Sequence, residues 1–135
     1  MRMKMAAAAI AAGVLLTGSV PATASTSGSA ATTCRKSSEW ITDPWNGRYQ
    51  KWYCDNDAGA GVYRNTTKVG IMESTRSWFL CWDRIRMHPG GNNVWYYTQG
   101  DRVVVDPENQ AWGYMPAVHV QHPDDPIPGM VRCDV

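Results

Sequence analysis

The chain has 135 residues, of which 13 are basic and 12 are acidic. This length fits one domain. The near balance of charge argues against a nucleic-acid partner bound through bulk positive charge. Seven Trp, six Tyr and one Phe make up the aromatic residues. Trp and Tyr can pack a small core, and they can also present flat faces to a ligand.

The N-terminus has the order of a secretory signal peptide. Arg2 and Lys4 precede an unbroken apolar run at 6–16, and an A-x-A cleavage pattern follows at 22–24. The apolar run is too short to span a membrane. We therefore predict that residues 1–24 are cleaved, that the mature protein does not insert into a membrane, and that it is secreted to the extracellular side.

A flexible lead-in is predicted after the cleavage site. Residues 25–33 read STSGSAATT, which is small, polar and without periodicity. The compact part of the chain is expected to begin near Cys34.

Four cysteines follow the predicted cleavage site, at Cys34, Cys54, Cys81 and Cys133. An even number in an exported chain indicates two disulfides, and four cysteines allow three pairings. The sequence contains no C-x-x-C, and the spacings suit no common zinc module. The residues alone leave the choice of pairing open.

Short strands separated by turns are predicted for most of the mature chain, which indicates an all-β barrel or sandwich. The candidate strands are 60–64, 69–72, 77–83, 94–98, 102–106 and 112–115. Residues 34–54 give no clear pattern, and either one short helix or loops alone could occupy them.

The strand at 77–83 is the strongest candidate, and its period of two separates two faces. Phe79 and Cys81 share one face, while Trp78, Leu80 and Trp82 share the other. A disulfide-bonded Cys81 is expected to be buried, which places Phe79 in the core. Trp78 and Trp82 are then candidates for partial exposure, either free for a ligand or packed against the N-terminal segment.

The order of several short motifs resembles the secreted SH3-like domains of bacteria, in the form common in actinobacterial exported proteins. The motifs are G-V-Y at 61–63, V-G at 69–70, Phe79 with Cys81, Trp95, G-Y-M-P-A-V-H-V at 113–120, and a Pro-rich tail that closes in Cys133. The resemblance covers about residues 60–133. It implies a small SH3-like β-barrel over 60–135, preceded by a Cys-bounded N-terminal extension at 34–59.

The same resemblance implies a disulfide pairing. In that family a cysteine of the central strand typically pairs with one near the C-terminus. This implies Cys81–Cys133 and, with it, Cys34–Cys54.

A looser similarity to the wider SH3 fold implies a ligand groove. Trp95 matches the groove tryptophan and Pro116 the groove proline, while His119 stands where the pattern has a tyrosine. With Tyr63, these residues are the expected ligand-binding set. The histidine departs from the pattern, because a smaller ring that titrates near neutral pH replaces a phenol.

Metal binding is not expected. His119 and His122 form an H-x-x-H pattern, which on a helix could hold a metal. Pro123 and Pro126 exclude a helix across the acidic residues that follow. We therefore predict loop histidines at the surface, with no metal and no cofactor.

Catalysis is not expected either. No G-x-S-x-G occurs, no serine or threonine has an identifiable histidine base, and all four cysteines are expected to be oxidised. Asp55 and Asp57 lie in a turn rather than across a groove. A ribonuclease-like site could draw on residues that are near one another in sequence, namely Glu73, Arg76, Arg84, Arg86 and His88. Arg84 and Arg86 alternate on one face and could bind phosphate, but they also fit an ordinary solvated strand end. The prediction is a protein that is not an enzyme.

These observations lead to a secreted, non-catalytic binding module, monomeric, whose partner is a cell-wall peptide or another extracellular peptide or protein. One alternative is a peptidase inhibitor that inserts the exposed loop 89–93 into a protease cleft. A small secreted hydrolase is a further alternative.

Overall fold

The structure is a computed structural model that describes Gly18 and residues 33–133. Apart from Gly18 and Thr33, the predicted signal peptide and lead-in lie outside the described residues. The described chain is all-β, as predicted, with two short 3-10 turns, η1 (Pro107–Asn109) and η2 (Ala117–His119). No helix of the described residues is long and apolar enough to cross a membrane.

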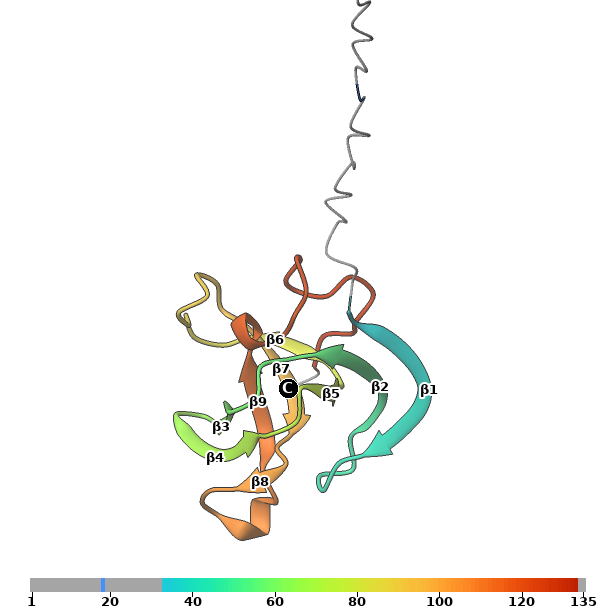
Figure 1. The fold of residues 1–135 in the computed structure, drawn as a ribbon. Helices are drawn as coiled ribbons and strands as arrows, with labels where there is room; N and C mark the ends of the chain where they lie inside the picture. The colour runs from blue at the N-terminus through green and yellow to red at the C-terminus, as the bar shows by residue number, and fades with distance from the viewer. Residues whose placement is uncertain (1–17, 19–32, 134–135) are drawn as a thin grey trace, which may run out of the picture.

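Nine strands form two sheets (Figure 1). The three-stranded sheet has the order β1-β2-β5, and the six-stranded sheet has the order β6-β7-β9-β3-β4-β8. Their bounds are β1 (Arg35–Thr42), β2 (Arg48–Asp55), β3 (Ala60–Arg64), β4 (Thr67–Met72), β5 (Arg76–Phe79), β6 (Trp82–Arg84), β7 (Val94–Gln99), β8 (Arg102–Val103) and β9 (Trp112–Pro116). The six-stranded sheet stays open, because β6 and β8 stand at opposite ends of its strand order.

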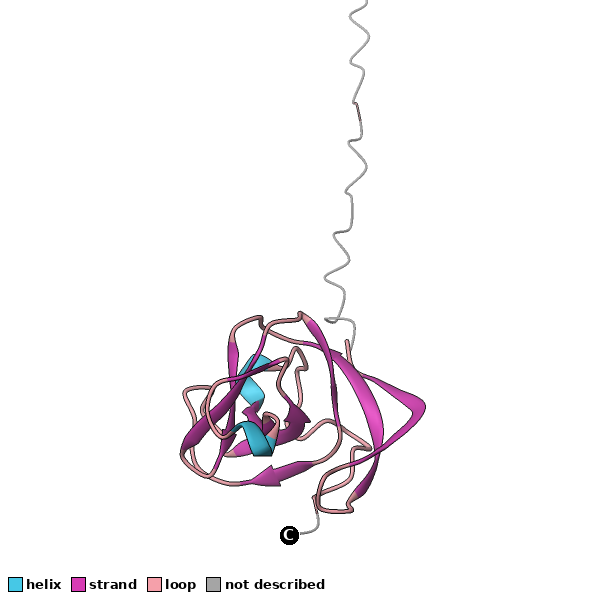
Figure 2. Cartoon of the chain, turned by 90° about the horizontal axis from the view of Figure 1, so that it is seen from below, coloured by secondary structure: helices cyan, strands magenta, loops and turns pink. Residues whose placement is uncertain are grey.

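Residues 34–54, for which the sequence allowed either one short helix or loops, form most of a long β-hairpin. β1 and β2 pair antiparallel from Arg35–Tyr53 to Thr42–Arg48, with a register shift between Lys36 and Trp40. Such a bulge bends a strand and increases its twist, and both strands are strongly curved in Figure 1. In Figure 2 the hairpin again lies on the outer right side of the molecule. β2 also pairs with β5, so hydrogen bonds tie the hairpin directly to the following part of the chain.

The expected single strand at 77–83 is divided between the two sheets. β5 pairs with β2, whereas β6 pairs with β7. Between them the backbone of Leu80 and Cys81 bonds to Tyr97, and Phe79, Leu80 and Cys81 are all fully buried. The predicted alternation therefore fails at Leu80, because the chain changes sheets there. Phe79 lies in the core and Trp78 and Trp82 are half-buried, as predicted.

The expected strand at 102–106 is also shorter than predicted. β8 contains only Arg102 and Val103, although the Val104 N–H still donates to the Val69 carbonyl at 2.8 Å. Asp106 then adopts a left-handed conformation with φ 55°, and Pro107 opens η1. A left-handed residue followed by proline ends an edge strand.

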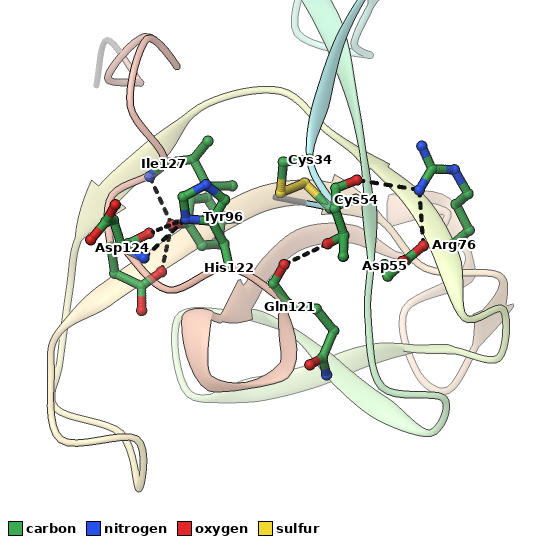
Figure 3. The surroundings of a disulfide bond; sticks show 11 residues. Cys34, Cys54, Asp55, Arg76, Tyr96, Gln121, His122, Asp124 and Ile127 are labelled. Carbon is green, nitrogen blue, oxygen red and sulfur yellow. Dashed lines mark hydrogen bonds and ion pairs between the residues drawn. A yellow bond between two sulfur atoms is a disulfide. The ribbon is translucent and has the colours of Figure 1, made fainter. Parts of the chain in front are cut away.

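Both disulfides have the pairing that the family resemblance implied. Cys34–Cys54 closes the open end of the β1–β2 hairpin. Cys81–Cys133 joins the segment between β5 and β6, where the chain passes from one sheet to the other, to the C-terminal tail. Figure 3 shows Gln121 close to the first disulfide. The Gln121 N–H also donates to the Asp55 carbonyl at 2.8 Å, which connects the end of β2 to the segment that leads into the tail. Two such bonds suit an oxidising, extracellular type of environment.

The two faces of the six-stranded sheet carry different clusters. Alternate residues of β7 and β9, such as Val94, Tyr96 and Met115, pack in the larger core with Phe79. The opposite face carries Tyr97 and Trp112, which pack with Leu80 and the Cys81–Cys133 disulfide. This second face is where the candidate site lies.

Candidate functional site

An aromatic face is built by the register of three neighbouring strands. Tyr114 of β9 lies opposite Tyr97 of β7 and also opposite Tyr63 of β3. Side chains opposite one another in antiparallel strands share a face, so these three rings lie together with Trp95, two residues from Tyr97 on β7. The ring centroids of Tyr97 and Tyr114 are 5.2 Å apart, and those of Tyr63 and Trp95 are 5.8 Å apart.

The tip of the β1–β2 hairpin covers one side of this face. Ile41 and Tyr49 pack against the cluster of Tyr97 and Trp112, and the Tyr49 and Tyr97 rings make an edge contact at 5.7 Å. Between the hairpin turn and the sheet a groove of about 580 Å³ remains. This volume lies within the range of pockets that bind small molecules and short ligand segments.

Seven aromatic side chains, two arginines and one carboxylate supply most of the groove wall. They are Trp45, Tyr49, Tyr63, Trp95, Tyr97, Trp112 and Tyr114, with Arg64, Arg86 and Asp43. Such a surface offers flat apolar contact area and a few polar groups that can orient a ligand.

Asp43 attaches the hairpin turn to the sheet. Its Oδ1 accepts hydrogen bonds from the backbone N–H groups of Trp45 (3.0 Å) and Gly47 (2.7 Å), which shape the turn. Its Oδ2 accepts a hydrogen bond from the Tyr97 hydroxyl at 2.8 Å. The side chain is buried, and both of its oxygens are engaged. A Cβ added at Gly47 would lie 2.6 Å from the Tyr49 ring, so that ring would have to move to admit a side chain at this position.

The tyrosines of the aromatic face ionise with difficulty. Burial, together with the Asp43 carboxylate, raises the pKa of Tyr97 far above its ordinary value of 10. Burial, with smaller contributions from the charges of Asp83 and Asp43, raises the pKa of Tyr114 to about 12. These hydroxyls are therefore neutral hydrogen-bonding groups at physiological pH.

Alkaline titration tests this environment. The pKa of Tyr114 and Tyr97 is higher in the folded chain than in the unfolded chain, where it is about 10. Above that pH the unfolded chain releases protons that the folded chain retains, so the free energy of unfolding is expected to fall as pH rises. In a titration to alkaline pH, the tyrosinate absorbance of the folded protein should rise at a higher pH than that of the urea-unfolded chain. Coincident titration curves, with the folded circular dichroism retained, would contradict this prediction.

The two arginines are stacked on rings of the groove. The guanidinium carbon of Arg86 lies 4.4 Å from the centroid of the Trp95 ring and 5.5 Å from that of Tyr63. The guanidinium carbon of Arg64 lies 4.3 Å from the centroid of Trp45. Cation–π contacts at these distances hold both guanidinium groups in place.

The structure brings together two of the four predicted ligand-binding residues. Tyr63 and Trp95 both lie in the groove. Trp95 is only 3% exposed, since Tyr63, Arg86 and His88 surround it and its Nε1–H donates to the Arg86 carbonyl at 2.8 Å. It therefore supports the groove floor more than it contacts solvent.

The other two predicted residues do not line the groove. Pro116 lies opposite Trp95 in the β7–β9 pair but is buried. His119 lies in η2, where its Nδ1 is 3.1 Å from the Asp57 carboxylate and its carbonyl accepts from the Asp57 N–H at 2.9 Å. These contacts attach His119 to the chain after β2 rather than to the groove.

Sequence reasoning missed most of the groove wall. The contribution of the β1–β2 turn could have been recognised from the turn sequence D-P-W-N-G at 43–47, because Pro, Asn and Gly in this arrangement typify a tight turn. Arg64 and Arg86 carry no comparable signal, since both look like solvated strand ends until the fold places rings beside them.

His88 and His122 make local hydrogen bonds with the backbone of neighbouring loops. His88 fixes the loop 89–93, because its Nε2 is 2.9 Å from the Val94 carbonyl and its Nδ1 accepts from the Gly90 N–H at 3.1 Å. His122 Nδ1 accepts from the Asp124 N–H at 3.0 Å. Within residues 33–133, no three His, Cys, Asp or Glu side chains are grouped so that they could hold a metal ion.

Comparison with known proteins gives no family assignment. No protein-family model matches the chain, and neither a curated protein nor a solved structure matches it. The argument for function therefore depends on the groove itself.

Proposed function

We propose that this chain is a secreted, non-catalytic binding module on an SH3-like fold, and that its groove binds a peptide of the bacterial cell wall. The single observation that carries the proposal is the aromatic groove between the β1–β2 turn and the six-stranded sheet. The leader pattern and the two disulfides support export. The ordered motifs of residues 60–133 support the SH3-like class and its kinship with actinobacterial exported proteins.

Several features of the groove favour a peptide over a large flat partner. The groove is concave, and its aromatic wall combines ring faces with tyrosine hydroxyls and two fixed guanidinium groups. Ring faces suit apolar side chains, while hydroxyls and guanidinium groups suit the carbonyls and charges of a short peptide. The groups that line it bind and orient, so the proposed role is recognition without turnover.

Trp45 provides the most direct test. It is 49% exposed, it lines the groove and Arg64 stacks on it. Trp45→Ala is expected to weaken binding of the mature protein to purified cell walls at least tenfold, because aromatic anchors carry much of the binding energy in such sites. Binding is measured by co-sedimentation over a range of protein concentrations.

Trp40 provides the matched control. It is 54% exposed and carries a stacked arginine, Arg48, but it lies outside the groove. Trp40→Ala should therefore leave binding within about twofold of the parent. Equal losses in the two variants would contradict the groove assignment, and turnover of cell-wall material that a single groove variant abolishes would replace the proposal with a hydrolase.

A further inference from the structure

Among residues 33–133, two cations of the groove have no anionic partner. The ion pairs of the described residues are Arg76–Asp55, Arg102–Glu73, His119–Asp57 and Arg132–Asp83. Neither Arg64 nor Arg86 pairs with a carboxylate in residues 33–133. Both line the groove, and both keep a fixed position through a stacked ring.

The one carboxylate in the groove wall forms no ion pair with either of them. Asp43 is buried, and its two oxygens already accept from Trp45, Gly47 and Tyr97. Its single negative charge offsets at most one of the two guanidinium charges, so the lining residues keep a net positive charge on an aromatic surface. In a partly enclosed site such a charge attracts an anion more strongly than it would in open water.

The geometry of each guanidinium suits a carboxylate. A guanidinium has five N–H donors in one plane. Arg86 donates from Nη1 to the Asn65 carbonyl, and Arg64 donates from Nη1 to Asn109 Oδ1 at 2.8 Å. A ring stacked against the face of a guanidinium leaves the edge for further hydrogen bonds, and the edge is the part that binds a carboxylate with two parallel bonds.

We propose that the groove recognises a peptide through a carboxylate, which Arg86 and Arg64 bind while the adjoining apolar part of the peptide packs on Trp45 and Tyr63. The inference rests on the proposed function and names the chemical group that the site selects. A carboxylate occurs at the C-terminus of a peptide and on acidic side chains, so the test has to separate these two sources.

The probe is one synthetic peptidoglycan stem peptide that ends in D-Ala-D-Ala, prepared in three forms. The first form has all carboxylates free, the second is amidated only at the C-terminus, and the third is amidated at every carboxylate. Affinity for the mature protein is measured by titration calorimetry. Full amidation is expected to weaken binding at least tenfold, which is the scale of a lost charge-assisted hydrogen bond.

The three forms identify the source of the carboxylate. A loss on C-terminal amidation alone would assign the site to the terminal carboxylate, and a loss only on full amidation would assign it to an acidic side chain. Equal affinity for all three forms would overturn the carboxylate inference and leave the proposed function standing. No binding of any form would overturn the proposed function, and the inference with it.

Substitution of the two arginines tests whether their side chains bind the carboxylate. Arg86→Gln and Arg64→Gln should each weaken binding of the free peptide at least tenfold, with little effect on the fully amidated peptide. Arg84→Gln is the matched control, because Arg84 is exposed, stacks near Trp82 and lies outside the groove. A loss in Arg84→Gln equal to that in Arg86→Gln would show a nonspecific charge effect and overturn the assignment.

A phosphorylated probe tests the class of anion. A stem peptide that is amidated at every carboxylate and carries one phosphoserine is expected to bind no tighter than the free-carboxylate peptide at equal ionic strength. If it instead binds tighter than the free-carboxylate peptide, the site selects phosphate and the inference is wrong.

Discussion

Replacement of both Cys81 and Cys133 by serine is expected to lower the free energy of unfolding by about 4 kcal/mol. The disulfide closes a loop with a sequence separation of 52 residues, which the unfolded chain would otherwise sample freely. Both cysteines are buried in the cluster that supports the aromatic face. Because a domain of this size has a net stability of only about 5–15 kcal/mol, the variant should be close to unfolding at 37 °C.

Replacement of Cys34 and Cys54 is the comparison. Its sequence separation is 20, for which the same chain-entropy argument gives about 3 kcal/mol. Urea denaturation followed by tryptophan fluorescence measures both variants against the parent. If the Cys34/Cys54 variant loses clearly more stability than the Cys81/Cys133 variant, the entropic ranking is wrong and local packing around the hairpin dominates.

The strands that follow residue 60 were predictable because apolar residues alternate there and turn residues separate the runs. The expected strand at 60–64 is present as β3, and the run at 94–98 appears in β7. The hairpin at 35–55 was not predictable in the same way. β1 reads RKSSEWIT, whose only large apolar residues, Trp40 and Ile41, are adjacent rather than alternating. Its pairing with β2 and the Cys34–Cys54 bond hold it in a sheet that local sequence does not specify.

The site was only half predictable for a related reason. The SH3-like resemblance supplied Tyr63 and Trp95 as candidate ligand contacts, and these residues lie on β3 and β7 of one sheet with β9 between them. It could not show that a hairpin outside that pattern adds Trp45, Tyr49 and Asp43 to the opposite wall. The groove therefore depends on a long-range contact, and residues that the SH3-like motifs do not contain form one of its walls.

That long-range contact leads to a second large effect. Asp43→Ala is expected to lower the free energy of unfolding by about 2–3 kcal/mol, because it leaves the buried Tyr97 hydroxyl without its acceptor and removes the side chain that shapes the turn. With the turn released from the sheet, binding of cell-wall peptide should fall at least tenfold. Stability is measured by urea denaturation, and binding is measured on the folded fraction at low temperature.

Two milder substitutions separate the effect of the shape of the turn from the effect of the hydrogen bond that joins it to the sheet. Tyr97→Phe leaves Asp43 Oδ2 without its donor but keeps the two turn hydrogen bonds to Oδ1, so it should keep the turn and cost less than Asp43→Ala, which loses all three. Asp43→Asn retains an oxygen that can accept from Trp45 and Gly47, while its amide can donate to the Tyr97 hydroxyl. If Tyr97→Phe and Asp43→Asn bind peptide like the parent while Asp43→Ala does not, the shape of the turn governs the groove. If Tyr97→Phe and Asp43→Ala both lose binding while Asp43→Asn does not, the hydrogen bond between sheet and hairpin governs it. Unchanged binding in all three folded variants would show that the hairpin wall takes no part in recognition, and the ligand would then contact only the sheet.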